Sequence, residues 1–168
     1  MGTGFRYILF AELNMIYQDT KIELARIEDA LEIALISKNF IERGLVWRWT
    51  ERKVKNSILS DTKNVAVARL ENKIVGFGIM HYGDEVANLD LLAVKEGFRK
   101  EGIGKKLVKW LEEVAFNAGI GLVTIQTLEQ NADAQAFYQK LEYINIGKRL
   151  GYYQNNVNAI LMEKRLRK

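Results

Sequence analysis

The segment that begins at Leu92 constrains the fold most, because it joins an apolar strand to a glycine-containing loop and then to an amphipathic helix. The apolar run Leu92-Ala93-Val94 leads into Arg99-Lys100-Glu101-Gly102-Ile103-Gly104. Apolar residues then recur at helical spacing while polar residues fill the other face; they are Leu107, Trp110, Leu111, Val114 and Ala118. Such a unit leaves backbone N–H groups unpaired at the positive end of a helix dipole, which suits a phosphate group.

Two nucleotide-binding motifs that use glycine loops do not fit this segment. The dinucleotide-binding fingerprint needs a third glycine at position 107, where Leu107 stands. A P-loop needs glycine at 99 and Ser or Thr at 106, where Arg99 and Lys106 stand. Six bases against two acids between Lys95 and Lys109 still favour an anionic ligand. The alternative is a loop that only turns the chain.

The rest of the chain predicts strands and helices within one domain. Strands are expected at 21–27, 64–70, 74–81, 86–94, 122–128, 145–150 and 158–166, and helices at 29–37, 43–60, 103 to about 119, and 132–141. Thr50 is expected to cap a helix, and Glu71-Asn72-Lys73 predicts a hairpin turn. Residues 1–20 are expected to be an N-terminal extension, and 21–168 the domain. This order predicts an α/β (layered α+β) fold, with a mostly antiparallel mixed sheet and helices on both faces.

Composition excludes several kinds of site and partner. The chain has no cysteine and one histidine, so no disulfide or thiolate nucleophile can form, and no metal is predicted. The apolar run Tyr7-Ile8-Leu9-Phe10 is too short for a signal peptide, and no run approaches the roughly 18 residues of a membrane span. Cytoplasm is the expected compartment. Four bases and one acid in Glu163–Lys168 carry most of the +4 net charge, so a nucleic-acid partner is not predicted.

Two segments together resemble a known family. A strand that ends in Val94, followed by Arg99-Lys100-Glu101-Gly102-Ile103-Gly104, is similar to the acetyl-CoA signature of the GNAT superfamily, Arg/Gln-x-x-Gly-x-Gly/Ala. Some 30 residues downstream, Asn131-Ala132-Asp133-Ala134-Gln135-Ala136-Phe137-Tyr138-Gln139-Lys140-Leu141-Glu142-Tyr143 resembles the family segment Asn-x-x-Ala-x-x-Phe-Tyr-x-Lys-x-Gly-Phe. The departures are Glu96 where proline is usual and Glu142 where glycine is usual. The resemblance spans about residues 21–163 and implies a GNAT-like acyl-CoA N-acyltransferase fold.

The resemblance implies an N-acetyltransferase that uses acetyl-CoA as the donor. In the family the strand matching Leu92-Ala93-Val94 separates from the next strand, so these residues would bind pantetheine through main-chain atoms. The Val94 N–H would polarise the thioester carbonyl. Asn131 would bond the pantetheine arm. The pyrophosphate would bind to the loop residues Arg99, Lys100, Gly102, Ile103, Gly104 and Lys105.

The resemblance also implies that Tyr138 lies near the cofactor sulfur and protonates the departing thiolate. A tyrosine near its reference pKa of about 10 remains protonated while a thiol near about 8.5 leaves as the thiolate. The alternative is that Phe137-Tyr138 is a core aromatic pair on a short helix. Without cysteine, the acetyl group is expected to pass directly to the amine in a ternary complex.

The general base is less defined. Asn88 stands where some relatives carry glutamate. Asp90 is the first candidate because alternation along a strand puts it on the same face as Asn88, Leu92 and Val94. Glu85 at the strand entrance and His81 at the end of the preceding strand are the alternatives.

The acceptor is expected to be an amine of modest pKa. The ending Tyr152-Tyr153 followed by Ala159 and Met162 resembles the ribosomal-protein N-terminal acetyltransferases, and Trp47 and Trp49 are candidates for an acceptor pocket or for core packing. At pH 7 an α-amine costs about 1.4 kcal/mol to deprotonate and a lysine about 4.6 kcal/mol, which favours a peptide or protein N-terminus. A small-molecule amine and a non-catalytic CoA-binding regulatory module remain alternatives. The oligomeric state, monomer or homodimer, is left open.

Overall fold

The computed structural model describes residues 15–16, 19–42, 48–153 and 157–166. The predicted N-terminal extension falls mostly outside these residues and stays a prediction. The described strands are β1 (Lys21–Leu24), β2 (Lys63–Leu70), β3 (Lys73–Tyr82), β4 (Val86–Val94), β5 (Leu122–Leu128), β6 (Ile144–Tyr153) and β7 (Val157–Arg165). The helices are α2 (Ala30–Phe40), α3 (Glu51–Ile58), α4 (Ile103–Asn117) and α5 (Ala132–Lys140), with 3-10 turns at Ile27–Asp29 and Glu96–Phe98.

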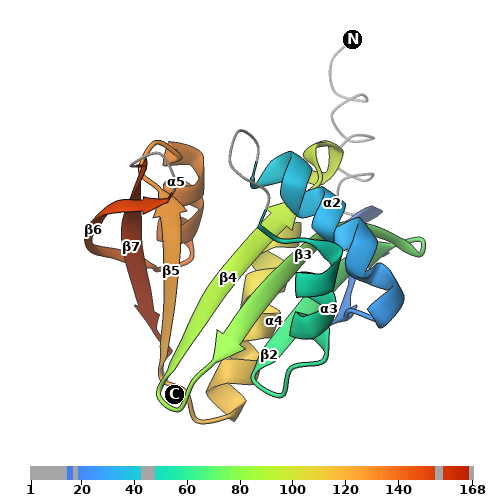
Figure 1. Ribbon diagram of the computed structural model, residues 1–168, viewed down its shortest axis with the longest axis horizontal. Coiled ribbons are helices and arrows are strands. Elements are labelled where there is room, and N and C mark those ends of the chain that lie inside the picture. The colour runs from blue at the N-terminus through green and yellow to red at the C-terminus, as the bar shows by residue number, and fades with distance from the viewer. Residues whose placement is uncertain (1–14, 17–18, 43–47, 154–156, 167–168) are drawn as a thin grey trace.

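The seven strands form one sheet in the order β1-β2-β3-β4-β5-β7-β6. Every neighbouring pair is antiparallel except β4 and β5, which are parallel and are joined through α4 (Figure 1). The two-residue turn between β2 and β3 places Glu71 and Asn72 at positive φ, as a tight hairpin requires. The predicted α/β class and mostly antiparallel mixed sheet are confirmed.

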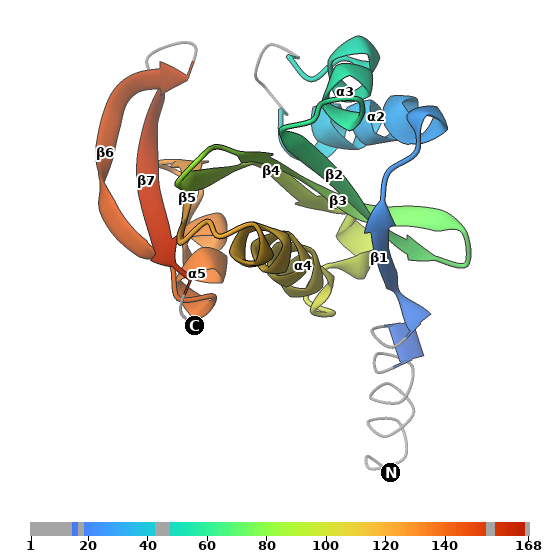
Figure 2. The ribbon, with the colours of Figure 1, turned by 90° about the horizontal axis from the view of Figure 1, so that it is seen from below.

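Helices cover both faces of the sheet, as the strand and helix order predicted (Figure 2). On one face α2 and α3 pack on a core that includes Val67, Phe77 and Ile79. On the other face α4 and α5 pack on a second core that includes Met80, Leu107 and Tyr143. Phe77 and Leu107 have no exposed surface, so each face buries large apolar side chains and excludes water from the sheet.

Two glycines of β3 allow α4 to lie close to the sheet. A Cβ on Gly78 would stand 2.9 Å from a methyl group of Leu111, and a Cβ on Gly76 would stand 2.9 Å from the Ala93 carbonyl oxygen. Both distances are shorter than ordinary van der Waals contact. The absence of side chains at these positions therefore sets the depth of the helix whose first turn forms part of the site.

The helix predicted over 43–60 is wrong in its first part. Arg48–Thr50 are not helical, and α3 begins at Glu51 after the predicted cap Thr50, whose hydroxyl accepts from the Lys53 N–H at 3.4 Å. Residues 43–47 lie outside the described residues. The other corrections concern ends: β1 is shorter than predicted, while α2, β6 and the start of β7 extend beyond the predicted bounds.

Glu142 ends α5 in the left-handed conformation that glycine usually adopts, with φ 70°. The Tyr143 N–H donates to the Tyr138 carbonyl at 3.0 Å and the Glu142 N–H to the Gln139 carbonyl at 3.0 Å. This pair of bonds is the Schellman motif, so the departure from glycine leaves the turn intact at the cost of a strained residue.

Candidate active site

The site lies where β4 and β5 stop pairing. Their parallel register covers only Val86–Leu89 against Leu122–Ile125, and beyond it the two strands separate towards α5 (Figure 1). The backbone of Leu91–Val94 therefore has β3 on one side and no strand on the other. Backbone N–H and C=O groups on this edge need partners, and an extended amide chain such as pantetheine supplies them. This geometry agrees with the strand separation that the family resemblance implied.

A β-bulge at Asp90 changes which face each β4 side chain occupies. Ile79 pairs with Leu91 and Met80 with Leu89, so Asp90 is an extra residue on β4. Leu89 accordingly belongs to the α4 core and Leu91 to the α2 core. The expectation that Asn88 and Asp90 share a face with Leu92 and Val94 is wrong, because the bulge reverses the alternation between them.

The first turn of α4 is an open anion site. Its first helical bond runs from the Lys106 N–H to the Gly102 carbonyl at 3.0 Å, which leaves the N–H groups of Ile103, Gly104 and Lys105 without a helical acceptor. Among the described residues no side chain caps this end, and its first turn carries no acid. Phosphate oxygens match these donors and the positive end of the helix dipole. The residues present fit the pyrophosphate of acetyl-CoA.

The predicted donor-binding residues lie at the end of β4, in the loop and first turn of α4, and at the start of α5. Lys100 and Gly102 both have positive φ, 67° and 76°, which directs the loop into the helix. The Arg99 side chain folds back, with Nε donating to the Val94 carbonyl at 3.0 Å and the guanidinium 5.5 Å from the centre of the Phe40 ring. Asn131 uses its side-chain oxygen to cap α5 by accepting from the Ala134 N–H at 3.0 Å.

Gly102→Val is expected to weaken acetyl-CoA binding at least tenfold. A β-branched residue is strained at φ 76°, and relief of that strain rotates the N–H groups away from the phosphates. Gly121→Val is the matched control, because a Cβ there meets no atom within 4 Å. Calorimetric titration with acetyl-CoA measures both, and equal affinity for the parent and a folded Gly102→Val variant would remove the loop from the site.

Gly104 has a second role that the sequence did not predict. A Cβ on it would lie 3.2 Å from the Phe137 ring, so its small size lets α5 pack against the first turn of α4. The loop glycine thus joins the two segments of the family signature.

Tyr138 follows Phe137 on α5 and is 8% exposed. Its ring makes edge contacts with Phe137 and Tyr143, with centroids 5.0 and 5.6 Å apart. Burial raises the pKa of the Tyr138 hydroxyl above its ordinary value, and nearby Tyr153 raises it further. Tyr138 is therefore neutral at physiological pH and can donate a hydrogen bond.

Tyr143, which contacts the Tyr138 ring, belongs to a buried polar network. The Tyr143 hydroxyl donates to Glu112 Oε1 at 2.9 Å, and Lys164 Nζ lies 2.8 Å from Glu112 Oε2. A surface cavity of about 550 Å³ borders Glu112 and Lys164 but is lined by α4 and β7 away from the open turn.

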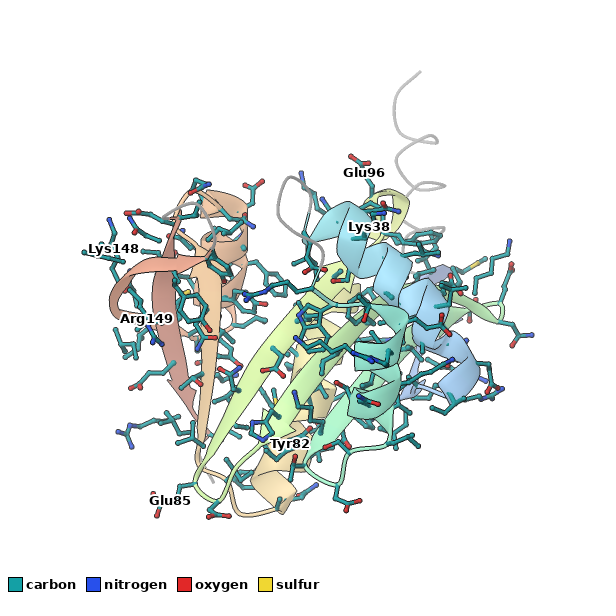
Figure 3. All side chains as sticks on the ribbon, in the orientation of Figure 1. Lys38, Tyr82, Glu85, Glu96, Lys148 and Arg149 are labelled. Carbon is teal, nitrogen blue, oxygen red and sulfur yellow. The ribbon has the colours of Figure 1, made fainter. Side chains whose placement is uncertain are left out.

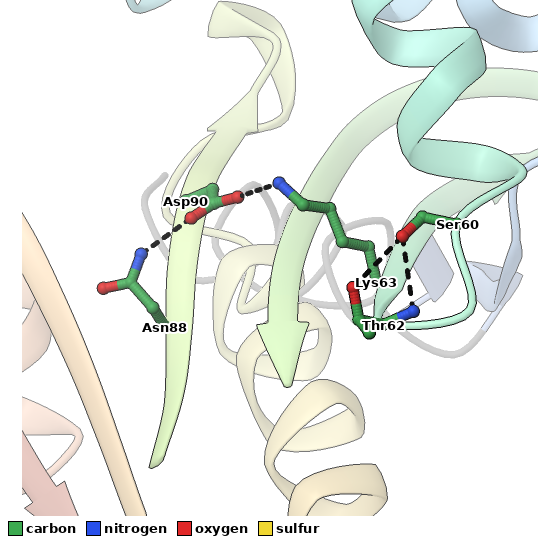
Figure 4. Close-up of polar contacts among 5 residues, drawn as sticks. All are labelled: Ser60, Thr62, Lys63, Asn88 and Asp90. Atoms are coloured by element: carbon green, nitrogen blue, oxygen red, sulfur yellow. Dashed lines mark hydrogen bonds and ion pairs between the residues drawn. The ribbon is translucent and has the colours of Figure 1, made fainter. Parts of the chain in front are cut away.

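A row of polar side chains, here called the polar face, lies on the α2 side of the sheet. Asn88 Oδ1 accepts from Thr124 Oγ1 at 3.0 Å and from Gln126 Nε2 at 3.1 Å. Its amide nitrogen must then face Asp90, to which it donates at 2.7 Å. Lys63 Nζ lies 2.8 Å from the other Asp90 oxygen (Figure 4). The polar face comprises Lys63, His81, Asn88, Asp90, Thr124 and Gln126.

The three candidate bases lie in different surroundings. Asp90 is half-buried with both oxygens occupied. His81 is exposed and pairs in register with Lys63 and Asn88 on the polar face. Glu85 is exposed at the β3–β4 turn, at the opposite end of β4 from Glu96 (Figure 3). Glu85 lies five residues before Asp90, about 17 Å of extended strand, and stays the more distant candidate base.

Glu42 is a buried group that sequence reasoning missed. Its carboxylate accepts from the Ser37 hydroxyl at 3.2 Å, the Arg48 N–H at 2.7 Å and the Trp49 N–H at 3.3 Å. It thereby fixes Trp49, which packs against the α2 core beside the polar face. Trp47 lies outside the described residues.

Thr127, two residues beyond the last β4–β5 pair, has a buried hydroxyl with no hydrogen-bond partner in the part of the chain that the structure describes. Thr127→Val keeps the shape and removes this unpaired group, so the free energy of unfolding is expected to rise by about 1 kcal/mol. Thr124→Val, on the same strand, deletes a bonded hydroxyl and should lower it. Chemical denaturation measures both; a loss of stability in Thr127→Val would mean that a bound water satisfies the hydroxyl.

Comparison with known proteins identifies the class. The pattern of the Acetyltransferase (GNAT) family matches residues 27–143, which include both signature segments. The chain is 30% identical over 125 residues to an uncharacterised N-acetyltransferase of Chlorobaculum tepidum, covering 74% of this chain and 78% of that protein. The chain therefore belongs to the GNAT family, and it is an acetyl-CoA-dependent N-acetyltransferase.

Two other proteins that this chain resembles are named for acceptor amines that differ from each other. The thialysine N-epsilon-acetyltransferase of Caenorhabditis elegans is 26% identical over 129 residues, covering 67% of this chain and 80% of that protein. The ribosomal-protein-S18-alanine N-acetyltransferase of Escherichia coli shares the fold, with a TM-score of 0.77 at 19% identity and coverage of 89% and 95%. Among the described residues no helix is long and apolar enough to cross a membrane, and no cluster could hold a metal ion.

Proposed function

We propose that the chain transfers the acetyl group of acetyl-CoA directly to the α-amine of a peptide or protein N-terminus. The observation that carries this proposal is the combination of an open β4 edge and an uncapped α4, with a buried neutral Tyr138 on the neighbouring α5. The edge and the helix end suit an extended, phosphate-bearing donor, and a neutral tyrosine suits a hydrogen bond to its leaving thiolate.

Each group then has one task. The open α4 turn, with Lys100 and Lys105 beside it, binds the pyrophosphate. The backbone of Leu92–Val94 bonds pantetheine, and the Val94 N–H stabilises the negative charge that develops on the carbonyl oxygen. The amine attacks the carbonyl carbon from the polar face, a C–N bond forms and the C–S bond breaks. Tyr138 donates a hydrogen bond to the leaving sulfur, and Asp90 receives the amine proton.

The polar face supports an acceptor of modest pKa. Both Asp90 oxygens already accept a hydrogen bond, one of them from the Lys63 ammonium. An α-amine with a pKa near 8 loses its proton to a base more readily than a lysine with a pKa near 10.4. The S18-alanine enzyme acts on a protein N-terminus and favours this reading, whereas the thialysine enzyme favours a small-molecule amine as the second candidate.

An acceptor screen tests the proposal. Thiol release from acetyl-CoA is measured with peptides of varied first residue, the same peptides with blocked N-termini, thialysine and simple diamines. Turnover that requires a free α-amine is the expected result. Turnover with thialysine alone would move the acceptor to a small molecule, and acetyl-CoA binding without turnover on any acceptor would favour a regulatory module.

A further inference from the structure

The charge around Asp90 is unusual for a site that receives a cation. Lys63 Nζ pairs with Asp90 at 2.8 Å and also lies 5.7 Å from the centre of the Trp49 ring. Lys53 Nζ lies 4.1 Å from the same ring. The ammonium groups of Lys53 and Lys63 thus lie over this indole. The Glu42 carboxylate, which accepts from the Trp49 N–H, is buried and already binds three donors.

Lys63 is held by its ion pair with Asp90 and by the Trp49 ring. Its side chain is 25% exposed and that of Asp90 19% exposed, so water only partly screens the pair. Asn88, fixed by Thr124 and Gln126, binds the other oxygen of Asp90 and prevents the carboxylate from turning away (Figure 4). The Lys63 ammonium therefore lies beside Asp90 on the polar face.

A fixed cation discriminates between acceptors by their second charge. An acceptor that bears a carboxylate near its amine is attracted to Lys63 and Lys53, whereas one that bears a second ammonium is repelled by both. We propose that Lys63 is a specificity-determining residue that selects acceptor amines carrying a carboxylate and rejects diamines and polyamines. The inference rests on the proposed function, because it assumes that the acceptor crosses the polar face.

Matched acceptors test it. The peptides Ser-Glu-Ala-Ala-amide and Ser-Lys-Ala-Ala-amide differ in the sign of one side chain, and 5-aminopentanoate and 1,5-diaminopentane pose the same question for small amines. The ratio of kcat/KM, carboxylate-bearing over ammonium-bearing, is measured for the parent, Lys63→Met, Lys63→Arg and Lys73→Met. Lys73 is an exposed control at the other end of the β2–β3 hairpin.

We expect the parent to prefer the carboxylate-bearing acceptor and Lys63→Met to lower the ratio about tenfold through the acceptor KM, with the acetyl-CoA KM unchanged. Lys63→Arg should keep the preference, and Lys73→Met should match the parent. An equal ratio in the parent and Lys63→Met, or a parent that prefers the diamine, would overturn the inference and leave the proposed function standing. A parent that neither binds acetyl-CoA nor acetylates any of the four acceptors would sink the proposed function as well.

Discussion

Tyr138→Phe is expected to lower the rate constant for acetyl transfer by roughly ten- to a thousandfold while acetyl-CoA affinity changes little. The substitution deletes one hydroxyl and keeps the ring that packs between Phe137 and Tyr143. Since burial raises the pKa of this hydroxyl, it carries no charge of its own, and we expect it to donate a hydrogen bond to the developing thiolate. The bond exists mainly in the transition state, so its loss appears in kcat.

Substitutions at two other tyrosines, Tyr82 and Tyr153, serve as controls for this experiment. Tyr82 has its hydroxyl 3.4 Å from the Leu111 carbonyl and lies towards the Glu85 end of the molecule (Figure 3). Tyr82→Phe should therefore leave kcat unchanged. Tyr153 is nearer, and burial raises its pKa to about 12, so it is also protonated at neutral pH. A loss of rate in Tyr153→Phe and not in Tyr138→Phe would transfer the acid role to Tyr153.

Alkaline stability gives an independent measure of these buried hydroxyls. The pKa of Tyr82 and that of Tyr153 are both raised to about 12, mainly by burial, above the unfolded value near 10. Below pH 10 the two hydroxyls are protonated in both the folded and the unfolded chain, so their contribution to the free energy of unfolding is constant. Between pH 10 and 12 the unfolded chain loses protons that the folded chain keeps, so stability falls.

The sequence predicted those parts of the site that depend on local pattern. The bounds of β4 and β5 were correct because each is a short apolar run between turn residues. The amphipathic spacing of α4 and the glycines before it predicted the open helix end. Thr50 was correctly predicted as a cap because its side chain acts within one turn.

The missed features all depend on contacts between distant residues. The bulge at Asp90 arises from the register with β3, which a single strand sequence does not encode. The pair Lys63–Asp90 joins residues 27 positions apart, and Arg69 pairs with Glu23 and Asp29 across similar separations. Glu42 was assigned to no role because its backbone partners lie six and seven positions further along the chain. No periodicity in the chain marks such positions.

Asp90→Asn is expected to lower the rate near neutral pH by about a hundredfold if Asp90 receives the proton of the acceptor. The amide keeps the shape and can still bond Asn88 or Lys63, so the fold should persist. What it loses is proton affinity. The residual rate should climb with pH, about tenfold per unit, until the acceptor amine is free in solution.

The occupied oxygens of Asp90 sharpen this prediction. Lys63 holds one oxygen and Asn88 the other, so the proton reaches Asp90 only when the acceptor ammonium replaces Lys63 or a water relays it. His81→Gln, on the same face, and Glu85→Gln, about 17 Å from Asp90 along the strand, should then change the rate by less than about twofold. If Asp90→Asn has the parent's pH profile in height and shape, the amine loses its proton before it binds or to another group. A profile altered in His81→Gln instead would identify that group.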